Sequence, residues 1–355
     1  MISLYIHIPF CARKCDYCSF YSVTDNCKEQ YVDALERALA YHGKKQKTAT
    51  VYIGGGTPSL ISPALLERVF SAVYDNFDID KSAEITIEAN PESFSRDFAL
   101  TAKNFGVNRL SLGVQSFDDK ELASVGRLHD SKGAKDALSL ACDMFENISC
   151  DLIFGLPYQT EKSFESSLDT ACKSGVNHIS CYNLQVEHGT PIYQKQIAVP
   201  DEEIQEKLYF LACEKLEQNG YEHYEISNYA KKGFESRHNS SYWTGADYIG
   251  IGPSAHSKLG NMRFYYDADI CKFISKKDFE FDGGERITDP LFEKIMLGLR
   301  TSRGIPADIL KKSAAYVARL EKSGFAVVKN GRVILTDKGF YLSNTIISDI
   351  TAKEL

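Results

Sequence analysis

The first two-thirds of the chain alternates strand-like and helix-like stretches, and no other feature restricts the possible fold as strongly. Repeats of strand, helix and strand form parallel sheets with right-handed crossovers. The predicted strands are residues 4–9, 50–53, 84–89, 109–114, 149–154 and 178–184. The predicted helices between and after them are residues 29–41, 63–74, 96–104, 118–125, 131–145 and 161–174.

Polar residues gather where the predicted strands end. The strands themselves are nearly continuous apolar runs, as expected when both faces of a sheet are buried. The residues at their C-terminal ends include the glycine run 54–57, Glu88, Gln115 and Asp151. These ends form the active face of a (β/α) barrel. Six repeats instead of eight predict an α/β fold with a partial (β/α)6 TIM-type barrel, open on one side.

A second, smaller unit is predicted at the C-terminus. The alternation breaks after about residue 190, where one further strand is predicted at 221–229. Helix-like stretches at 291–301, 307–311 and 314–323 then precede two short strands, 325–328 and 332–335. The Asn-Gly pair between these strands favours a hairpin. We therefore expect a barrel with a following irregular segment over residues 1–285 and a winged-helix-like domain over 286–355. Its basic residues are dispersed, which favours packing or a lid over DNA binding.

Composition narrows the class of protein. A net charge of −7 argues against nucleic acid as a partner. No apolar run reaches the roughly 18 residues of a membrane helix, and the start of the chain lacks the basic region of a signal peptide. We expect a cytoplasmic protein, with peripheral contact at the inner face of the membrane as an alternative. Seven of the ten cysteines stand singly, as is typical of core residues.

The other three cysteines, Cys11, Cys15 and Cys18, follow the first predicted strand. Thiolates favour zinc, copper(I) or iron–sulfur clusters. A four-iron cluster held by three cysteines keeps one iron open to a small molecule. A zinc site is the main alternative, in which His7 or Cys27 would complete a tetrahedron. No second pair of closely spaced cysteines supports that alternative.

Two further groups of residues are candidates for binding. Gly55, Gly56 and Thr57 would let the backbone approach a ligand closely, although a simple tight turn would use the same residues. The side chains at the strand ends, together with Arg127, could hold ribose hydroxyls and a carboxylate. The alternative is a set of buried polar residues that satisfy one another.

His238 opens the segment His-Asn-Ser-Ser-Tyr-Trp, which contains the single tryptophan. A histidine beside aromatic rings could ligate haem iron. Taken alone, such a histidine is more often a structural hydrogen-bonding residue.

These motifs together resemble a known superfamily. Cys-x3-Cys-x2-Cys after the first strand and Gly-Gly-Thr-Pro-Ser after the second are similar to radical S-adenosylmethionine (radical SAM) proteins. The segments His-Ile-Pro-Phe-Cys, Glu-Ala-Asn-Pro and Gly-Val-Gln-Ser resemble its oxygen-independent coproporphyrinogen III oxidase group over nearly the whole chain. Phe20 stands where the oxidases carry a fourth cysteine, and their N-terminal extension is not seen. Both departures, with the segment at His238, resemble the haem-chaperone branch, HemW.

The resemblance implies a set of sites. It places a [4Fe–4S] cluster on Cys11, Cys15 and Cys18, with S-adenosylmethionine on the open iron. The positions that match its cofactor site are Tyr5, Gly55, Gly56, Thr57, Glu88, Gln115, Arg127 and Asp151. It also favours His238 as a haem ligand. In such proteins the cofactor supplies the hard chemistry and the protein supplies position and exclusion of water.

The implied function is that of a haem chaperone without coproporphyrinogen oxidase activity. Its expected partners are haem, client haemoproteins such as respiratory enzymes, an electron donor for the cluster and a second copy of the chain in a homodimer. The alternatives are an oxidase that decarboxylates coproporphyrinogen propionates and a radical SAM haem-degrading methyltransferase. A DNA-binding regulator is the most distant alternative.

Overall fold

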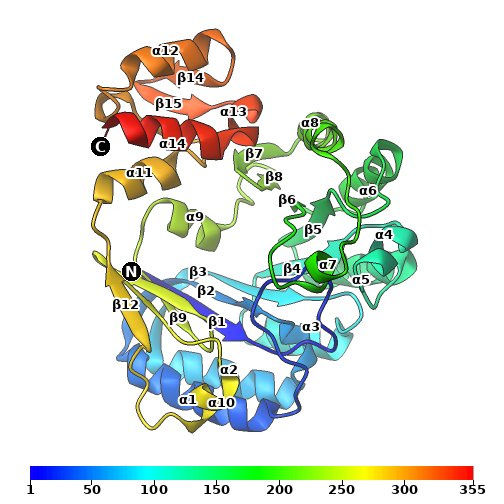
Figure 1. The fold of residues 1–355 in the computed structure, drawn as a ribbon. Coiled ribbons are helices and arrows are strands. Elements are labelled where there is room, and N and C mark those ends of the chain that lie inside the picture. The colour runs from blue at the N-terminus through cyan, green and yellow to red at the C-terminus, as the bar shows by residue number, and fades with distance from the viewer. Residues whose placement is uncertain (355) are drawn as a thin grey trace.

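Six parallel strands, adjacent in sequence order, form the centre of the fold (Figure 1). The structure is a computed structural model and describes residues 1–354. Each of the six strands pairs in parallel with the next. They are β1 Ile2–Ile8, β2 Gln46–Gly55, β3 Phe77–Ala89, β4 Arg109–Gln115, β5 Ile148–Phe154 and β6 His178–Asn183. The predicted partial barrel is confirmed.

The predicted helices lie between these strands, on the outer side of the arc (Figure 1). They are α1 Lys28–Gly43, α2 Pro63–Asn76, α3 Arg96–Asn104, α4 Asp119–Ser124, α5 Ser131–Met144 and α6 Glu161–Lys173. Several begin at capping side chains: Ser62, Asp130 and Thr160 each accept a hydrogen bond from the first turn. Helix starts could be predicted well because these caps are visible in the sequence.

Strand β3 is longer than the sequence predicted. It begins at Phe77, seven residues before the predicted start. Its first part is polar and partly exposed, so it lacks the apolar signal of a buried strand. Residues 77–79 nevertheless pair with residues 46–48 of β2. Backbone pairing, and not side-chain burial, extends the strand there.

The sheet also continues beyond the six strands, on both sides. Strand β9 pairs in parallel with β1, and β10, β11 and β12 follow in antiparallel order. On the other side β8 and β7 extend the sheet from β6 as a hairpin, where one strand was expected at 221–229. The added strands are β7 Glu222–Glu225, β8 Asn228–Ala230, β9 Tyr248–Ile251, β10 His256–Leu259, β11 Met262–Tyr265 and β12 Gly283–Arg286.

Helix α9 stands between the sheet and the C-terminal part of the chain in Figure 1. It spans Arg237–Trp243, and its first two amides donate to the Glu84 carboxylate of β3, at 2.9 and 2.8 Å. A carboxylate at this end of a helix is favourable because the amides there lack partners in the helix. The position of α9 on the barrel is thus fixed by β3. The other helices of this region are α7 Pro191–Gln194, α8 Glu202–Gln218 and α10 Ile270–Ser275.

The last part of the chain, residues 290–354, is called the C-terminal module here. Its predicted hairpin is present, with Asn330 and Gly331 at positive φ as a tight hairpin turn requires. The predicted helix at 307–311 is a short 3-10 turn, Ala307–Ile309. The elements are α11 Pro290–Gly298, β13 Ile305–Pro306, α12 Ala314–Lys322, β14 Ala326–Lys329, β15 Arg332–Leu335, α13 Asp337–Tyr341 and α14 Ser343–Glu354. Within residues 1–354, no helix has both the length and the apolar character needed to cross a membrane.

Candidate functional site

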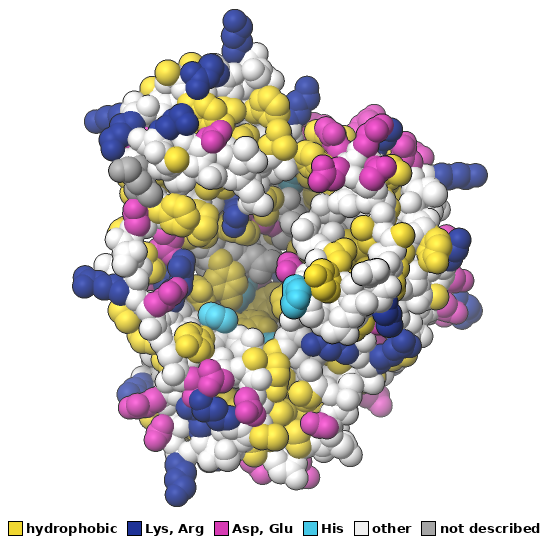
Figure 2. Space-filling view, viewed as in Figure 1, with side chains coloured by type: hydrophobic (Ala, Val, Ile, Leu, Met, Phe, Trp, Pro, Cys, Tyr) yellow, Lys and Arg dark blue, Asp and Glu magenta, His cyan; other side chains and the backbone are white. Residues whose placement is uncertain are grey.

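The loop after β1 carries Cys11, Cys15 and Cys18, all partly exposed on the wall of one cavity of about 450 Å³. In Figure 2 the molecule is hollowed at the centre of the face shown, in the region that Figure 1 places between α9 and α7. The loop is braced from several sides. Cys11 N–H donates to the Val23 carbonyl, and Asp16 donates to the Val125 carbonyl and pairs with Lys195 at 2.8 Å.

The three thiols are free, and two of them receive hydrogen bonds from cavity residues. Thr57 Oγ1 donates to Cys11 Sγ, and an Arg127 amino group donates to Cys15 Sγ, both at 3.5 Å. These two contacts hold the side chains of Thr57 and Arg127 against the cysteine loop. His7 is not free to act as a fourth ligand, because its ring nitrogens contact the Tyr21 carbonyl and the Tyr5 hydroxyl, each at 2.9 Å.

Glycine is required in the run after β2 because a side chain there would collide with neighbouring residues. Gly55 has φ of 111°, and a Cβ atom there would collide with the ring of His7. On Gly56 a Cβ atom would lie 2.7 Å from the Phe10 carbonyl oxygen. Both residues line the cavity beside the cysteine loop. Side chains are therefore excluded, and the backbone itself forms this part of the wall.

Glu88, at the end of β3, is the most perturbed acid of the cavity. Its carboxylate accepts from the Tyr52 hydroxyl at 2.6 Å and from Gly55 N–H at 3.0 Å. Burial raises the pKa of the carboxyl to about 6, against the opposite effect of these two donors. Glu88 thus titrates near pH 6, above the ordinary range of a glutamate, and is mostly ionised at neutral pH.

Arg127 reaches the cavity from the turn after α4, and its side chain is only 4 % exposed. One amino group donates to the Gly113 carbonyl at 2.6 Å and to Asn90 Oδ1 at 3.0 Å. Asn90 in turn donates to Thr57 Oγ1 at 3.0 Å. One chain of hydrogen bonds therefore links the ends of β2, β3 and β4 to the thiol of Cys15.

Asp151 is held by three serine hydroxyls on its own and neighbouring strands. They come from Ser111, Ser149 and Ser180, at 2.7–3.1 Å. Each of the three lies on β4, β5 or β6, and Asp151 itself lines the cavity. These donors fix the orientation of the carboxylate on the cavity wall.

Seven of the eight residues predicted for the cofactor site line this one cavity. Gln115 is among them and adopts φ of 68°, a left-handed conformation that is strained for a residue with a side chain. Tyr5 is the exception: it lies behind the lining, on β1, with its hydroxyl bonded to His7 Nδ1. The structure brings the predicted residues together apart from this one.

His238 lies on α9 and is 1 % exposed. Its Nδ1 is 2.8 Å from Thr50 Oγ1, and its Nε2 is 2.8 Å from the Tyr242 hydroxyl. Burial lowers its pKa to about 3, so the ring is neutral near pH 7. A neutral imidazole is the form that binds metal. Because both nitrogens have partners, iron could bind Nε2 only after Tyr242 moves. Ligation by His238 stays a prediction.

The cavity residues that were not predicted from the sequence include Tyr52, Asn90 and Arg109. Asn90 follows Glu88 and Ala89 at the end of β3, so its place at a strand end was a usable signal. Tyr52 lies two residues before Gly54 on the inward-facing side of β2, which the period of two could have indicated. Arg109 begins β4, at the opposite end from the polar cluster, and no signal in the sequence marks it.

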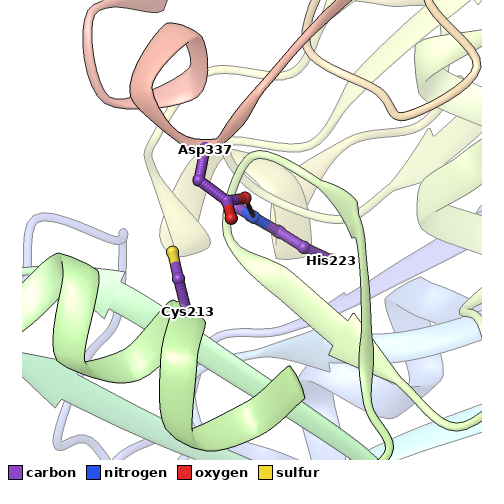
Figure 3. Close-up of side chains that lie close together, drawn as sticks. All are labelled: Cys213, His223 and Asp337. Atoms are coloured by element: carbon purple, nitrogen blue, oxygen red, sulfur yellow. Dashed lines mark hydrogen bonds and ion pairs between the residues drawn. The ribbon is translucent and has the colours of Figure 1, made fainter. Parts of the chain in front are cut away.

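A second group of metal-type side chains lies elsewhere, between the sheet and the C-terminal module (Figure 3). Cys213 of α8, His223 of β7 and Asp337 of α13 have their polar atoms within 4.8 Å of one another. His223 Nδ1 donates to Asp337 Oδ1 at 2.7 Å, and Cys213 Sγ is 3.3 Å from the Tyr229 hydroxyl. The His223 ring stacks on Tyr229 with centroids 4.1 Å apart. We call this group the His223 tie.

Comparison with known proteins agrees with this geometry. The family model of the radical SAM superfamily matches residues 5–171. A protein named heme chaperone HemW from Bacillus subtilis is 37% identical over 324 residues, covering 86% of this chain and 85% of that protein. Its namesake from Lactococcus lactis is 32% identical over 363 residues, covering 97% and 96%.

A solved structure shares the fold. It is the coproporphyrinogen III oxidase HemN from Escherichia coli, described as a radical SAM enzyme. The TM-score is 0.86 at 24% identity, with 98% of this chain and 89% of that chain covered. At this identity the likeness is one of fold.

Proposed function

The chain belongs to the HemW family within the radical SAM superfamily, and from that premise we propose that it binds haem and delivers it to client haemoproteins. One observation carries the proposal: the segment that begins at His238 borders the same cavity as the three cysteines. Asn239 of α9 lines that cavity together with Cys11, Cys15 and Cys18.

The residues around the cysteine loop fit a [4Fe–4S] cluster with an open iron. Three free thiols on one loop are suitable soft ligands, and the loop is braced by backbone hydrogen bonds. We propose Cys11, Cys15 and Cys18 as the ligands. When bound and reduced, the cluster supplies the electron that cleaves the sulfonium of S-adenosylmethionine.

The other cavity residues would position S-adenosylmethionine. The backbone at Gly55 and Gly56 offers a side-chain-free wall, and Arg127 offers a fixed positive charge for a carboxylate. Glu88 and Asp151 present acceptor oxygens for amino or hydroxyl groups. Thr57 and Arg127 also donate hydrogen bonds to the sulfur atoms of Cys11 and Cys15. These residues orient the ligand and exclude water from it.

We propose that haem binds beside α9, with His238 Nε2 as the iron ligand once the Tyr242 hydroxyl has moved away. The electron donor, the client haemoproteins, a homodimer and a cytoplasmic location belong to the same proposal. The segment around His238 supports it, because the helix is fixed to β3 through Glu84 while its side chains reach the cavity.

The test is to reconstitute the protein without oxygen and measure two quantities on the same sample. Stoichiometric haem binding without conversion of coproporphyrinogen III is the expected result. Steady formation of protoporphyrinogen would contradict the chaperone proposal and indicate an oxidase instead. His238→Ala should weaken haem binding while iron and sulfide content stay unchanged, and an unaltered haem spectrum would remove His238 as the ligand.

A further inference from the structure

Arg109 lies deep in the barrel, in a row of inward-facing side chains that crosses four strands. The backbone register places Tyr5 opposite Tyr52, Tyr52 opposite Thr86, and Thr86 opposite Arg109. Residues at such paired positions point to the same face of a sheet. Tyr52 and Arg109 both line the cavity of the cysteine loop, so this face is the barrel interior.

The guanidinium of Arg109 is buried and has no partner. The residue is 2 % exposed, and its Nε has no hydrogen bond. Within residues 1–354, no group forms a hydrogen bond or an ion pair with its side chain, although its positive charge favours the ionised form of Glu88 nearby. An unpaired buried charge is costly, so proteins retain one mainly where a ligand supplies the missing partner.

Thr86 adds a second unpartnered group beside it. Thr86 is fully buried, and its Oγ1 also lacks a hydrogen-bond partner. Because Thr86 and Arg109 are directly paired in the sheet, their side chains are neighbours on the inner face. A hydroxyl and a guanidinium together are donors suited to the two oxygens of a carboxylate.

The acids of the cavity do not fill this need. The Glu88 carboxylate already accepts from Tyr52 and Gly55, and the Asp151 carboxylate accepts from its three serines. Arg127 offers the contrast within the same cavity. Its guanidinium is held at the strand ends by Gly113 and Asn90, beside the expected S-adenosylmethionine site, whereas the guanidinium of Arg109 has no such contacts.

The position of Arg109 separates it from the cysteine-loop end of the cavity. Arg109 is the first residue of β4 and Gln115 the last. At about 3.3 Å per residue, their Cα atoms are roughly 20 Å apart. Of the residues predicted to hold S-adenosylmethionine, Gln115 lies at the far end of β4, whereas Glu88 pairs with Ser111, two residues from Arg109. A group bound by Arg109 therefore lies deeper in the barrel than Gln115 and the cysteine loop.

Residues of α9 lie beside this row of side chains, so a ligand of Arg109 can bind between α9 and the sheet. The ring of His238 lies 5.0 Å, between centroids, from the ring of Tyr52, which neighbours Thr86 in the sheet. Asn239 lines the cavity that contains Arg109. A ligand seated against α9 would thus meet Tyr52 first and then Arg109, beside which Thr86 is buried in the sheet.

We propose that Arg109 and Thr86 form a binding site for a carboxylate of the ligand that occupies the barrel beside α9. This inference rests on the proposed function, under which the carboxylate is a propionate of haem. Arg109 is then the residue that distinguishes haem with free propionates from the same ring without them.

The experiment compares metal-free protoporphyrin IX with its dimethyl ester by absorbance titration, since both lack iron and His238 ligation does not contribute. The wild type should bind the free acid about 10- to 100-fold more tightly than the ester, the range expected for a buried charged hydrogen bond. Arg109→Gln should remove that preference and leave the affinity for the ester unchanged. Thr86→Val, which keeps all charges, should weaken only the free acid, by about fivefold.

The matched control is Arg303→Gln. Arg303 is an exposed arginine that lines a different cavity, of about 520 Å³, between α9 and the C-terminal module. It should leave both affinities unchanged. The proposal is overturned if Arg303→Gln abolishes the preference instead, if the wild type binds acid and ester equally, or if Arg109→Gln weakens both alike. It is also overturned if S-adenosylmethionine, and not the porphyrin, loses affinity in Arg109→Gln.

The same measurements distinguish a failure of the proposed function from a failure of the Arg109 site. A wild type that binds neither haem nor porphyrin overturns both proposals, whereas haem binding without preference for the free acid overturns only the role of Arg109. Circular dichroism of the ligand-free variants separates folding from binding. If Arg109→Gln and Arg109→Lys both lose structure while Thr86→Val binds normally, Arg109 is structural and the site is wrong.

Discussion

The cysteine loop and the His223 tie both gather side chains that commonly bind metal, yet they differ in how their atoms are occupied. The loop presents three partly exposed thiols to a cavity, with donors from Thr57 and Arg127. In the tie, Cys213 is buried, burial raises the pKa of its thiol to about 12, and His223 is bonded to Asp337.

The difference teaches that residue type alone does not define a metal site. A thiol held protonated by burial is a poor ligand, because the thiolate is the form that binds metal. The tie instead joins three elements, α8, β7 and α13, and thereby attaches the C-terminal module to the sheet (Figure 3). The thiols of the loop face a cavity, whereas the groups of the tie are occupied by one another and by Tyr229.

Removal of the loop thiols should give the largest effect. Replacement of Cys11, Cys15 and Cys18 together by Ala should abolish iron and sulfide after anaerobic reconstitution, because no soft ligands remain in the cavity. Cys213→Ala is the matched control and should retain the full iron and sulfide content. Both are measured by chemical analysis and absorbance. Recovery of zinc in place of iron from strictly anaerobic wild type would contradict the cluster.

Breaking the tie should affect stability and leave the cluster intact. His223→Ala removes a buried stacked ring and the bond to Asp337, and should lower the free energy of unfolding by about 2–4 kcal/mol. Denaturant unfolding measures the loss. Asp308→Asn, an exposed change in the same module, should stay within about 0.5 kcal/mol. Lost iron binding in His223→Ala would show that the tie holds metal after all.

Replacement of Glu88 by an uncharged residue should raise the stability of the protein, whereas His223→Ala should lower it. Folding raises the pKa of Glu88 to about 6, so ionisation of Glu88 opposes folding. The free energy of unfolding is therefore highest while Glu88 is protonated, and it falls as the pH rises through 6. Glu88→Gln cannot ionise, so the ligand-free variant should be more stable than wild type by about 2 kcal/mol at pH 7–8. The gain should vanish as pH falls toward 4.5. Thermal unfolding across this range tests the sign, and a gain that is constant with pH would argue against a titrating Glu88.

The smallest expected effect is a change in haem affinity when the Tyr242 hydroxyl, the partner of His238 Nε2, is removed. Tyr242→Phe removes the hydroxyl that occupies Nε2, so the nitrogen no longer has to exchange a hydrogen bond for iron. Haem affinity should rise about fivefold, corresponding to roughly 1 kcal/mol. Titration with haem provides the measurement, and Tyr248→Phe, on the neighbouring ring of the stack, is the control. Weaker haem binding in Tyr242→Phe would instead make the hydroxyl part of the haem site.

Much of the barrel could be predicted because each strand and helix carries a local signal. The apolar run at β5 and the cap at Thr160 are examples. Strand β9 could not be predicted, since it is only four residues long with a glycine inside it, and its pairing with β1 joins residues far apart in sequence. The split of residues 221–229 into a hairpin was missed for the same reason.

The candidate site divides in the same way. The cysteines, the glycine run and the strand-end residues were found by their position along the chain. Arg109 and Tyr52 become visible only through the register of four strands, which no local pattern specifies. The partners of His238 also depend on distant segments, Thr50 among them. The sequence alone does not show which polar groups already have hydrogen-bond partners in the folded protein.

The pairing of β9 with β1 also has a consequence for the order in which the protein is made. About 240 residues separate the end of β1 from the start of β9. At about 5–20 residues per second, a ribosome needs roughly 12–50 s to synthesise them. During that time the apolar strand that leads to the cysteine loop has one open edge, which invites mispairing. Strand β1 therefore acquires its second partner only after the chain has been synthesised as far as residue 251.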